Sequence, residues 1–311
     1  MKIAFVFPGQ GSQSVGMMAA YHDLPGLRET FTEASDALGS DLWKLVEEGP
    51  AEALDQTVNT QPAMLAAGVA VYRAWRAAGG APPVMLAGHS LGEYSALVAA
   101  GSLAFGDAVQ LVRFRAQCMQ DAVPAGVGAM AAVIGLDDEA VRAACTEATT
   151  GEETAEAANY NAPGQVVVAG HKAAVERATE AANAKGAKRA MLLPMSVPSH
   201  CSLMKPASGR LRERLESTVV SAPGVPVFHN ADVATHGDAA AVKSALVRQL
   251  CEPVRWVDTI RTLHANGATH IVECGPGKVL AGLNKRIAVA AQTIALTDAA
   301  AFEAALATMR G

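Results

Sequence analysis

Short apolar runs alternate with longer helical patterns in the outer parts of the chain. The run at 2–8 is ended by Pro-Gly, and the helical pattern at 60–79 ends at a Gly-Gly pair. The other predicted strands are 83–87, 269–274 and 293–297, and the other predicted helices are 26–38, 90–101, 106–121, 253–266, 277–288 and a final alanine-rich segment. Such alternation indicates a mainly parallel sheet with helices on both faces. We therefore predict an α/β fold.

The middle of the chain shows a different pattern. Strands are predicted at 128–136, 155–160, 165–170 and 188–193, and helices at 137–146 and 171–184. The order β-α-β-β-α-β is that of a ferredoxin-like unit. Proline and glycine in 124–126 and prolines in 194–198 suit hinges on either side of it. The prediction is a small domain over 127–196, inserted into a larger domain formed by 1–126 and 197–311.

Composition and charge narrow the functional classes. Half of the 311 residues are hydrophobic and 18% are charged, which excludes a disordered chain or a coiled coil. The net charge of -5 disfavours a nucleic-acid partner. The first apolar run is too short for a signal peptide, and no run is long enough to span a membrane. The five cysteines have no CxxC or CxxH spacing, so no zinc site is expected. We expect a cytoplasmic protein with no bound metal.

The strongest chemical signal is the sequence Gly-His-Ser-Leu-Gly at 88–92, which fits the pattern G-x-S-x-G. A predicted buried strand precedes it and a predicted helix follows it, as a nucleophile elbow requires. The elbow would lift the hydroxyl of Ser90 above the edge of the sheet. The backbone N–H of Leu91, at the start of the helix, could then face a developing oxyanion. A chance match in an ordinary loop is the alternative.

A serine hydroxyl needs a base, and the chain has eight histidines. His200 lies in a rigid, proline-containing segment directly after the predicted insertion. It could be that base or a packed loop residue. His89 neighbours the serine but should point away from it, and His229 follows a strand-like run as a weaker candidate.

Two further polar features could belong to the same site. The glycine-rich loop around Gln10 follows the first predicted strand, at the edge where ligands bind in α/β sheets. It could complete an oxyanion hole, or Ser12 could simply cap a helix. Arg113 and Arg115 lie in a mostly apolar helix. Either could extend its charge to solvent, whereas a buried arginine facing the elbow would require a carboxylate.

Seven ordered motifs together resemble the family of malonyl-CoA:acyl-carrier-protein transacylases, the discrete acyltransferases of type II fatty-acid synthesis. The resemblance covers essentially the whole chain. The motifs are FPGQGSQ (7–13), GHSLGEY (88–94), R-x-x-x-M-Q (115–120), NYNAPGQVVVAG (159–170), VPSH (197–200), QL-x-EPVRW (249–256) and ECGPGKVL (273–280). The family fold is an α/β-hydrolase-like domain with a mainly parallel sheet and a ferredoxin-like insertion, which agrees with the division above.

The resemblance also implies residue roles. Ser90 would attack the malonyl thioester, and His200 would act as its base. The backbone N–H groups of Gln10 and Leu91 would form the oxyanion hole. Arg115 would bind the free malonyl carboxylate. Gln249, in the same substrate-binding set, would orient His200 through a carbonyl oxygen.

The resemblance implies transient binding of an acyl carrier protein and of malonyl-CoA as substrate, by a monomer with no permanently bound cofactor. An acidic carrier would meet a local basic rim. The candidates for it are Lys185, Lys188, Arg189, Lys285 and Arg286. A discrete acyltransferase of a polyketide pathway is an alternative function. A serine esterase or thioesterase is another, and it would need an acidic partner for His200.

Overall fold

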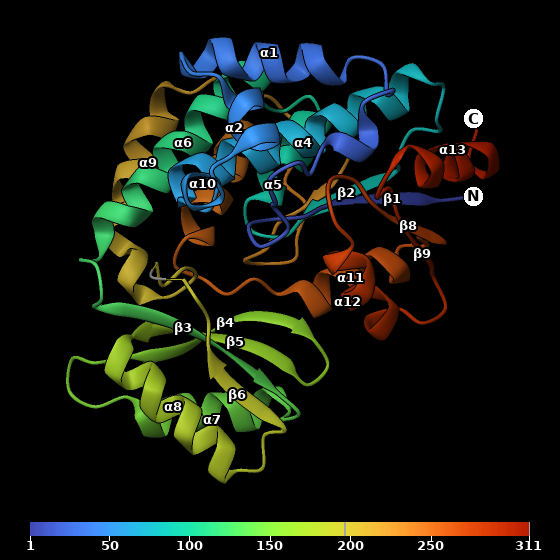
Figure 1. Cartoon of the computed structure of the whole chain (residues 1–311). Helices are drawn as coiled ribbons and strands as arrows, with labels where there is room; N and C mark the ends of the chain where they lie inside the picture. Colours follow the sequence, from blue (N-terminus) through green and yellow to red (C-terminus); the bar gives the residue numbers. More distant parts are fainter. Residues whose placement is uncertain (196, 311) are drawn as a thin grey trace.

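A five-stranded parallel sheet forms the centre of the larger part of the protein. The computed structural model describes residues 1–195 and 197–310. The strand order is β7-β2-β1-β8-β9, and every neighbouring pair is parallel. The strands are β1 (Ile3–Phe7), β2 (Met85–Gly88), β7 (Val227–Phe228), β8 (His270–Glu273) and β9 (Gln292–Ala295). Both termini lie on the same side of this part (Figure 1). The predicted α/β class with a mainly parallel sheet is confirmed.

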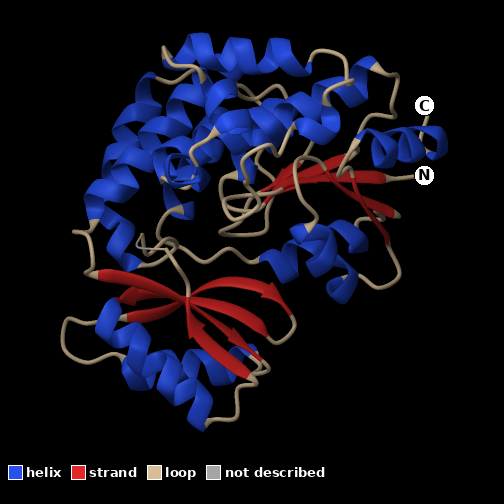
Figure 2. Ribbon diagram, viewed as in Figure 1, coloured by secondary structure: helices blue, strands red, loops and turns tan. Residues whose placement is uncertain are grey.

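A second sheet is built from the middle of the chain. Its four strands are antiparallel and follow the order β4-β5-β3-β6. Its elements are β3 (Gly128–Ile134), α7 (Asp138–Ala148), β4 (Ala155–Ala162), β5 (Gln165–His171), α8 (Lys172–Ala184) and β6 (Arg189–Leu192). Both helices cover the face of this sheet that points away from the rest of the molecule (Figure 2). The predicted element order β-α-β-β-α-β is therefore present in the structure.

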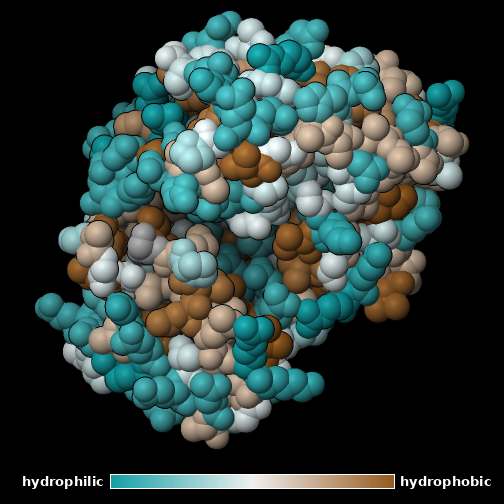
Figure 3. All heavy atoms as spheres, viewed as in Figure 1, coloured by the Kyte–Doolittle hydropathy of each residue, from teal (hydrophilic) through white to brown (hydrophobic). Residues whose placement is uncertain are grey.

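The two parts are joined by backbone and side-chain hydrogen bonds. Tyr160 N donates to the Val254 carbonyl at 2.9 Å, and Val254 N donates to the Ala158 carbonyl at 2.9 Å. The Arg286 guanidinium contacts Gln165 Oε1 at 2.7 Å. A hollow separates the two parts on the face drawn in Figure 3. The domain boundaries stay a prediction, and residue 196 of the predicted second hinge lies outside the described residues.

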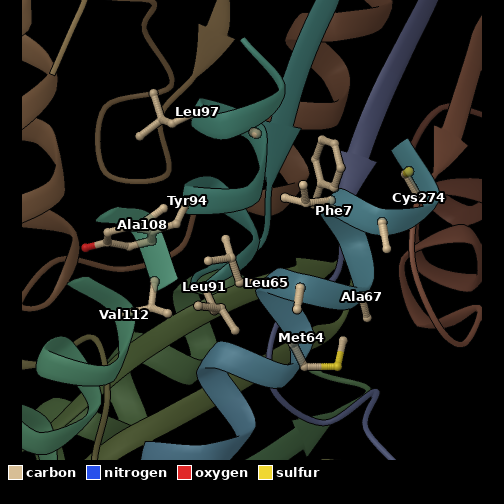
Figure 4. Close-up of a cluster of buried hydrophobic side chains, with 14 of the residues drawn as sticks. Phe7, Met64, Leu65, Ala67, Leu91, Tyr94, Leu97, Ala108, Val112 and Cys274 are labelled. Atoms are coloured by element: carbon tan, nitrogen blue, oxygen red, sulfur yellow. The ribbon is translucent and has the colours of Figure 1, made fainter. Parts of the chain in front are cut away.

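Alternate side chains of β1 serve two apolar cores. Phe5 and Phe7 belong to the larger cluster with α4 (Thr57–Ala77), whereas Ala4 and Val6 pack with α11 (Trp256–Ala265) and α12 (Val279–Ile287). The helices of this larger part are α1 (Leu27–Leu38), α2 (Leu42–Glu48), α3 (Ala51–Leu54), α4 (Thr57–Ala77), α5 (Gly92–Ala99), α6 (Phe105–Ala122), α9 (Lys205–Ser217), α10 (Ala239–Gln249), α11 (Trp256–Ala265), α12 (Val279–Ile287) and α13 (Ala299–Thr308), with short 3-10 helices at Ala19–Tyr21 and Ser202–Met204. Leu91 and Tyr94 lie close to Leu65 in the larger core (Figure 4). This packing fixes the start of α5 against α4 and α6.

The sequence patterns did not predict every element. Helices α2, α3, α9 and α10 and the two-residue strand β7 were absent from the predicted set. Strand β7 is too short for a periodicity to reveal, and α9 has a strongly polar sequence with three buried positions. Within residues 1–195 and 197–310, no helix is both long and apolar enough to cross a membrane. All five cysteines are free.

Candidate active site

The nucleophile elbow joins β2 to α5. Ser90 has a φ of 51°, in the left-handed backbone region that residues other than glycine rarely adopt. The flanking glycines allow the close approach of backbones at this turn. A Cβ on Gly88 would lie 1.9 Å from the Gly92 carbonyl carbon, and a Cβ on Gly92 would lie 2.0 Å from the Phe7 carbonyl oxygen. Only glycine fits at either position. The tight turn that these glycines allow places Ser90 at the carboxyl end of the central strands, as predicted.

His200 lies directly beside the serine hydroxyl. Its Nε2 is 2.7 Å from Ser90 Oγ, and its Nδ1 is 2.7 Å from the backbone carbonyl oxygen of Gln249. Because a carbonyl only accepts, Nδ1 carries the hydrogen and Nε2 can accept the hydroxyl proton. Burial, followed by the positive charge of Arg115, lowers the pKa of His200 from 6.5 to about 3. The imidazole is therefore neutral at pH 7 and has the geometry of a general base.

Arg115 is a buried cation next to the serine. Its side chain comes from α6, and the residue is only 1% exposed. One terminal nitrogen donates to Gln61 Oε1 at 2.9 Å, and the other donates to Gln249 Oε1 at 3.0 Å and to Ser90 Oγ at 3.3 Å. No ion pair involves Arg115 in the part of the chain that the structure describes. A guanidinium held only by neutral groups can bind a carboxylate supplied by a ligand.

The two predicted oxyanion-hole residues line the same cavity as Ser90. Leu91 precedes the first residue of α5, and Gln10 lies in the loop after β1. Neither backbone N–H donates a hydrogen bond to another described residue. Ser90 N, by contrast, donates to Asn230 Oδ1 at 2.7 Å and is not available to a ligand.

The cavity has a volume of about 500 Å³ and lies between the two sheets. From the larger part, its wall contains Ser90, His200 and Arg115; from the second sheet, it contains Met130 and Val167 among others. The predicted substrate-binding residue Gln249 does not line the cavity. It is fully buried behind Arg115 and touches both Arg115 and His200.

Sequence reasoning missed several polar residues around the elbow, of which Gln61, Glu93 and His229 are buried. Gln61 holds Arg115, and Asn161 Oδ1 accepts a hydrogen bond from His89 Nε2 at 2.8 Å. Glu93 accepts from His229 Nδ1 at 2.7 Å, so His229 bonds to this carboxylate and not to the serine. The hydrogen-bond partners of these residues lie far away in the sequence, so no local pattern predicts the contacts. Glu93 and Asn161 do lie within two of the motifs named above. Within 1–195 and 197–310, no cluster of three or more histidine, cysteine or acidic side chains could hold a metal ion.

Comparisons with known proteins agree on one family. A family model described as acyl transferase domain matches residues 4–299. The malonyl CoA-acyl carrier protein transacylase of Salmonella typhimurium is 55% identical over 98% of this chain and 99% of its own length. The crystal structure of an acyl-carrier-protein S-malonyltransferase from Burkholderia pseudomallei is 59% identical, with a TM-score of 0.97 over 99% of this chain and 100% of that one.

A further solved structure shows such an enzyme with a partner. It is a malonyl-transacylase in complex with a type II polyketide synthase (PKS) acyl-carrier protein. It is 50% identical to this chain, with a TM-score of 0.97 over 99% of this chain and 100% of that one.

Proposed function

Because the chain belongs to the acyl transferase domain family, we propose that its buried serine, histidine and arginine carry out the malonyl transfer for which its relatives are named. The protein is an acyltransferase that transfers malonyl groups from malonyl-CoA to an acyl carrier protein, its transient partner. The observation that carries the residue assignment is a buried Arg115, without a carboxylate partner among the described residues, 3.3 Å from Ser90 Oγ.

In the first half-reaction, Ser90 Oγ attacks the thioester carbonyl of malonyl-CoA. His200 Nε2 takes the hydroxyl proton as the C–O bond forms. The backbone N–H groups of Gln10 and Leu91 stabilise the oxyanion of the tetrahedral intermediate. Its collapse breaks the C–S bond, and the proton on His200 passes to the departing CoA thiolate. The product is a malonyl ester of Ser90 and free CoA.

The second half-reaction reverses these proton movements. His200 takes the proton of the carrier's phosphopantetheine thiol, and the thiolate attacks the malonyl ester. The C–O bond breaks, and Ser90 Oγ recovers the proton from His200. The backbone carbonyl of Gln249 holds the imidazole in the required tautomer throughout. No acidic side chain needs to contact His200, which separates this arrangement from a Ser-His-Asp triad.

Arg115 supplies the selectivity for a malonyl group. Its guanidinium pairs with the free carboxylate while the thioester carbonyl is held at Ser90. An acetyl group would leave this buried charge unpaired, and an unpaired buried charge is costly. The geometry therefore favours a malonyl over an acetyl donor.

Labelled malonyl-CoA tests the covalent mechanism. The label should become attached to Ser90 in the wild type, persist in the absence of carrier protein, and move to the carrier when it is added. Ser90→Ala should abolish labelling and slow transfer by at least about 10⁴-fold. Ser95→Ala is a matched control, because Ser95 is also buried on this segment and its hydroxyl has no hydrogen-bond partner in the described chain. Rapid hydrolysis without transfer would instead support an esterase or thioesterase.

We further propose that the carrier belongs to fatty-acid synthesis and that the enzyme acts as a cytoplasmic monomer without a bound cofactor. The solved complex with a type II PKS carrier keeps a polyketide pathway as the alternative. Comparing kcat/KM for a fatty-acid carrier and a polyketide carrier under the same conditions tests the pathway, and a higher value for the polyketide carrier would reverse the assignment. Sedimentation analysis tests the monomer.

A further inference from the structure

Asn230 bridges the two backbone groups on either side of the elbow. Its Oδ1 accepts a hydrogen bond from Ser90 N at 2.7 Å, and its Nδ2 donates to the Gly88 carbonyl at 2.7 Å. The residue is 1% exposed and follows β7, which pairs with β2 at the edge of the parallel sheet. One planar amide therefore holds the turn on both sides of the strained Ser90 backbone.

The bridging amide is itself held in place. Glu93 Oε2 accepts a hydrogen bond from Asn230 N at 2.8 Å and another from Gln249 Nε2 at 3.0 Å. The other Glu93 oxygen accepts from His229, and both side chains are fully buried. Arg255 N donates to the Asn230 carbonyl at 3.2 Å. The position of the amide is therefore determined by neighbours on α5 and α10 and by the segment before α11.

We propose that Asn230 is a positioning residue that holds Ser90 in its left-handed conformation and so keeps its hydroxyl in line with His200. This inference rests on the proposed role of Ser90 as nucleophile. A strained backbone persists only where surrounding contacts enforce it. Without the amide, Ser90 N and the Gly88 carbonyl lose their partners, and the elbow can relax toward ordinary φ values. Oγ would then move away from His200 Nε2.

A positioning role has a distinctive kinetic signature. Asn230 does not line the cavity and forms no hydrogen bond with Arg115. Its loss should therefore slow the acylation of Ser90 by malonyl and acetyl donors by the same factor. The malonyl-to-acetyl ratio should stay unchanged. A residue acting through Arg115 would alter that ratio, and a purely structural residue would lower the melting temperature without slowing the folded enzyme.

The test compares two substitutions at the bridge with one at a matched site. Asn230→Ala removes both hydrogen bonds, whereas ionised Asn230→Asp keeps the acceptor for Ser90 N and loses the donor to Gly88. Asn284→Ala is the control, since Asn284 is fully buried and, among the described residues, its side chain bonds to Trp256 alone. Rapid-quench measurement of Ser90 acylation by malonyl-CoA and by acetyl-CoA gives the rates, and thermal unfolding gives the stabilities.

We expect acylation to slow on the order of 100-fold in Asn230→Ala and about 10-fold in Asn230→Asp, equally for both donors, with Asn284→Ala within about threefold of the wild type. A folded Asn230→Ala enzyme that acylates within about threefold of the wild type would overturn the proposal, and so would a changed malonyl-to-acetyl ratio. If the alanine variant does not fold, an aspartate variant within about twofold of the wild type overturns it. A wild type that is never labelled on Ser90 would instead overturn the serine mechanism itself.

Discussion

The two sheets of this protein differ in how they use buried polar side chains. Four polar residues around the parallel sheet are at most 1% exposed: Glu93, Arg115, Asn230 and Gln249. Hydrogen bonds connect them in a chain, from Arg115 to Gln249, from Gln249 to Glu93, and from Glu93 to the backbone N–H of Asn230. Among the described residues of the second sheet and its helices, Asn159 is the one buried polar residue, and the core between them is mostly alanine and valine. Both parts line the same cavity.

This difference suggests separate roles, with the polar groups around the parallel sheet acting in the reaction and the second sheet mainly shaping the cavity. Buried donors and acceptors that are already aligned need no reorganisation when charge develops during the reaction. The apolar part of the second sheet's wall, which contains Met130 and Val167, supplies complementarity but cannot stabilise a charge, whereas Asn159 and Asn161 are its polar members. We therefore expect substitutions around the parallel sheet to change rate and selectivity, and substitutions of the apolar residues of the second sheet to change mainly the apparent affinity for the substrate and the carrier.

Among the changes that test this contrast between the two sheets, substitution of Arg115 has the largest expected effect. Arg115→Ala should lower kcat/KM for malonyl-CoA on the order of 100-fold, because a charge-assisted hydrogen-bonded pair is lost. Transfer from acetyl-CoA should change by less than about threefold, so the malonyl-to-acetyl ratio falls steeply. Competition between the two donors in one reaction measures the ratio. Arg113→Ala is the matched control, since Arg113 lies on the same helix and is only half-buried. An unchanged ratio in Arg115→Ala would mean that this cation does not bind the carboxylate.

Arg113 and Arg115 also show where sequence reasoning reaches its limit. The G-x-S-x-G elbow could be located because all of its determinants lie within a strand, a turn and a helix start. The choice between two arginines two positions apart depends on the rotation of α6 against α4, which no local pattern reports. The roles of Asn230 and Gln61 cannot be predicted from a local pattern, because their hydrogen-bond partners are 140 and 54 positions away. His200 was found through its rigid segment, but its contact with Ser90 comes from the tertiary fold.

The second prediction concerns the pH dependence of acylation. With a pKa of about 3, His200 stays neutral at pH 5, so the single-turnover acylation rate should change by less than about twofold between pH 7 and pH 5. A histidine with the ordinary pKa of 6.5 would lose roughly 25-fold over the same interval. Arg115→Ala should move the acidic limb toward neutral pH, because the positive charge of Arg115 is one cause of the lowered pKa. An acidic limb near pH 6.5 in the wild type would contradict the buried-base assignment.

Stability should depend on pH for the same reason. His200 binds a proton at about pH 6.5 in the unfolded chain but only near pH 3 in the folded one. Between these values the unfolded state holds the extra proton. The stabilisation associated with neutral His200 is therefore fully present above pH 6.5 and is lost as the pH falls toward 3. In the His200→Gln variant, the free energy of unfolding measured by chemical denaturation should vary less with pH between 6.5 and 3 than in the wild type.

A third, smaller effect tests whether the second sheet contributes to the rate of acylation. Asn161 on β4 gives this sheet a hydrogen bond to the elbow, through His89. Burial lowers the pKa of His89, so its ring is neutral and its Nε2–H needs an acceptor. Asn161→Ala should leave that donor unpaired and slow acylation by about tenfold. Asn161→Asp, which keeps the acceptor, should retain more activity. Equal rates in the wild type and both variants would reduce the second sheet to a purely steric role.

The smallest expected effect concerns the carrier-binding surface. Two of the five predicted cations have partners inside the protein. Lys185 pairs with Glu147 at 2.9 Å, and Arg286 donates to Gln165 and to the Pro163 carbonyl. Lys188, Arg189 and Lys285 are exposed and form no ion pair with another described residue.

Arg189 is the best placed of the three, because it begins the edge strand β6, whose continuation at 193–195 lines the cavity. A carrier held there would have its phosphopantetheine arm directed along that segment toward Ser90. Arg189→Glu should raise KM for the carrier about threefold to tenfold, since single exposed charges contribute little each. KM for malonyl-CoA should stay the same, and Lys44→Glu, an exposed cation on α2, should affect neither. Equal KM values for the carrier in the wild type and Arg189→Glu would place the docking surface away from β6, and added salt should reduce the difference if it is electrostatic.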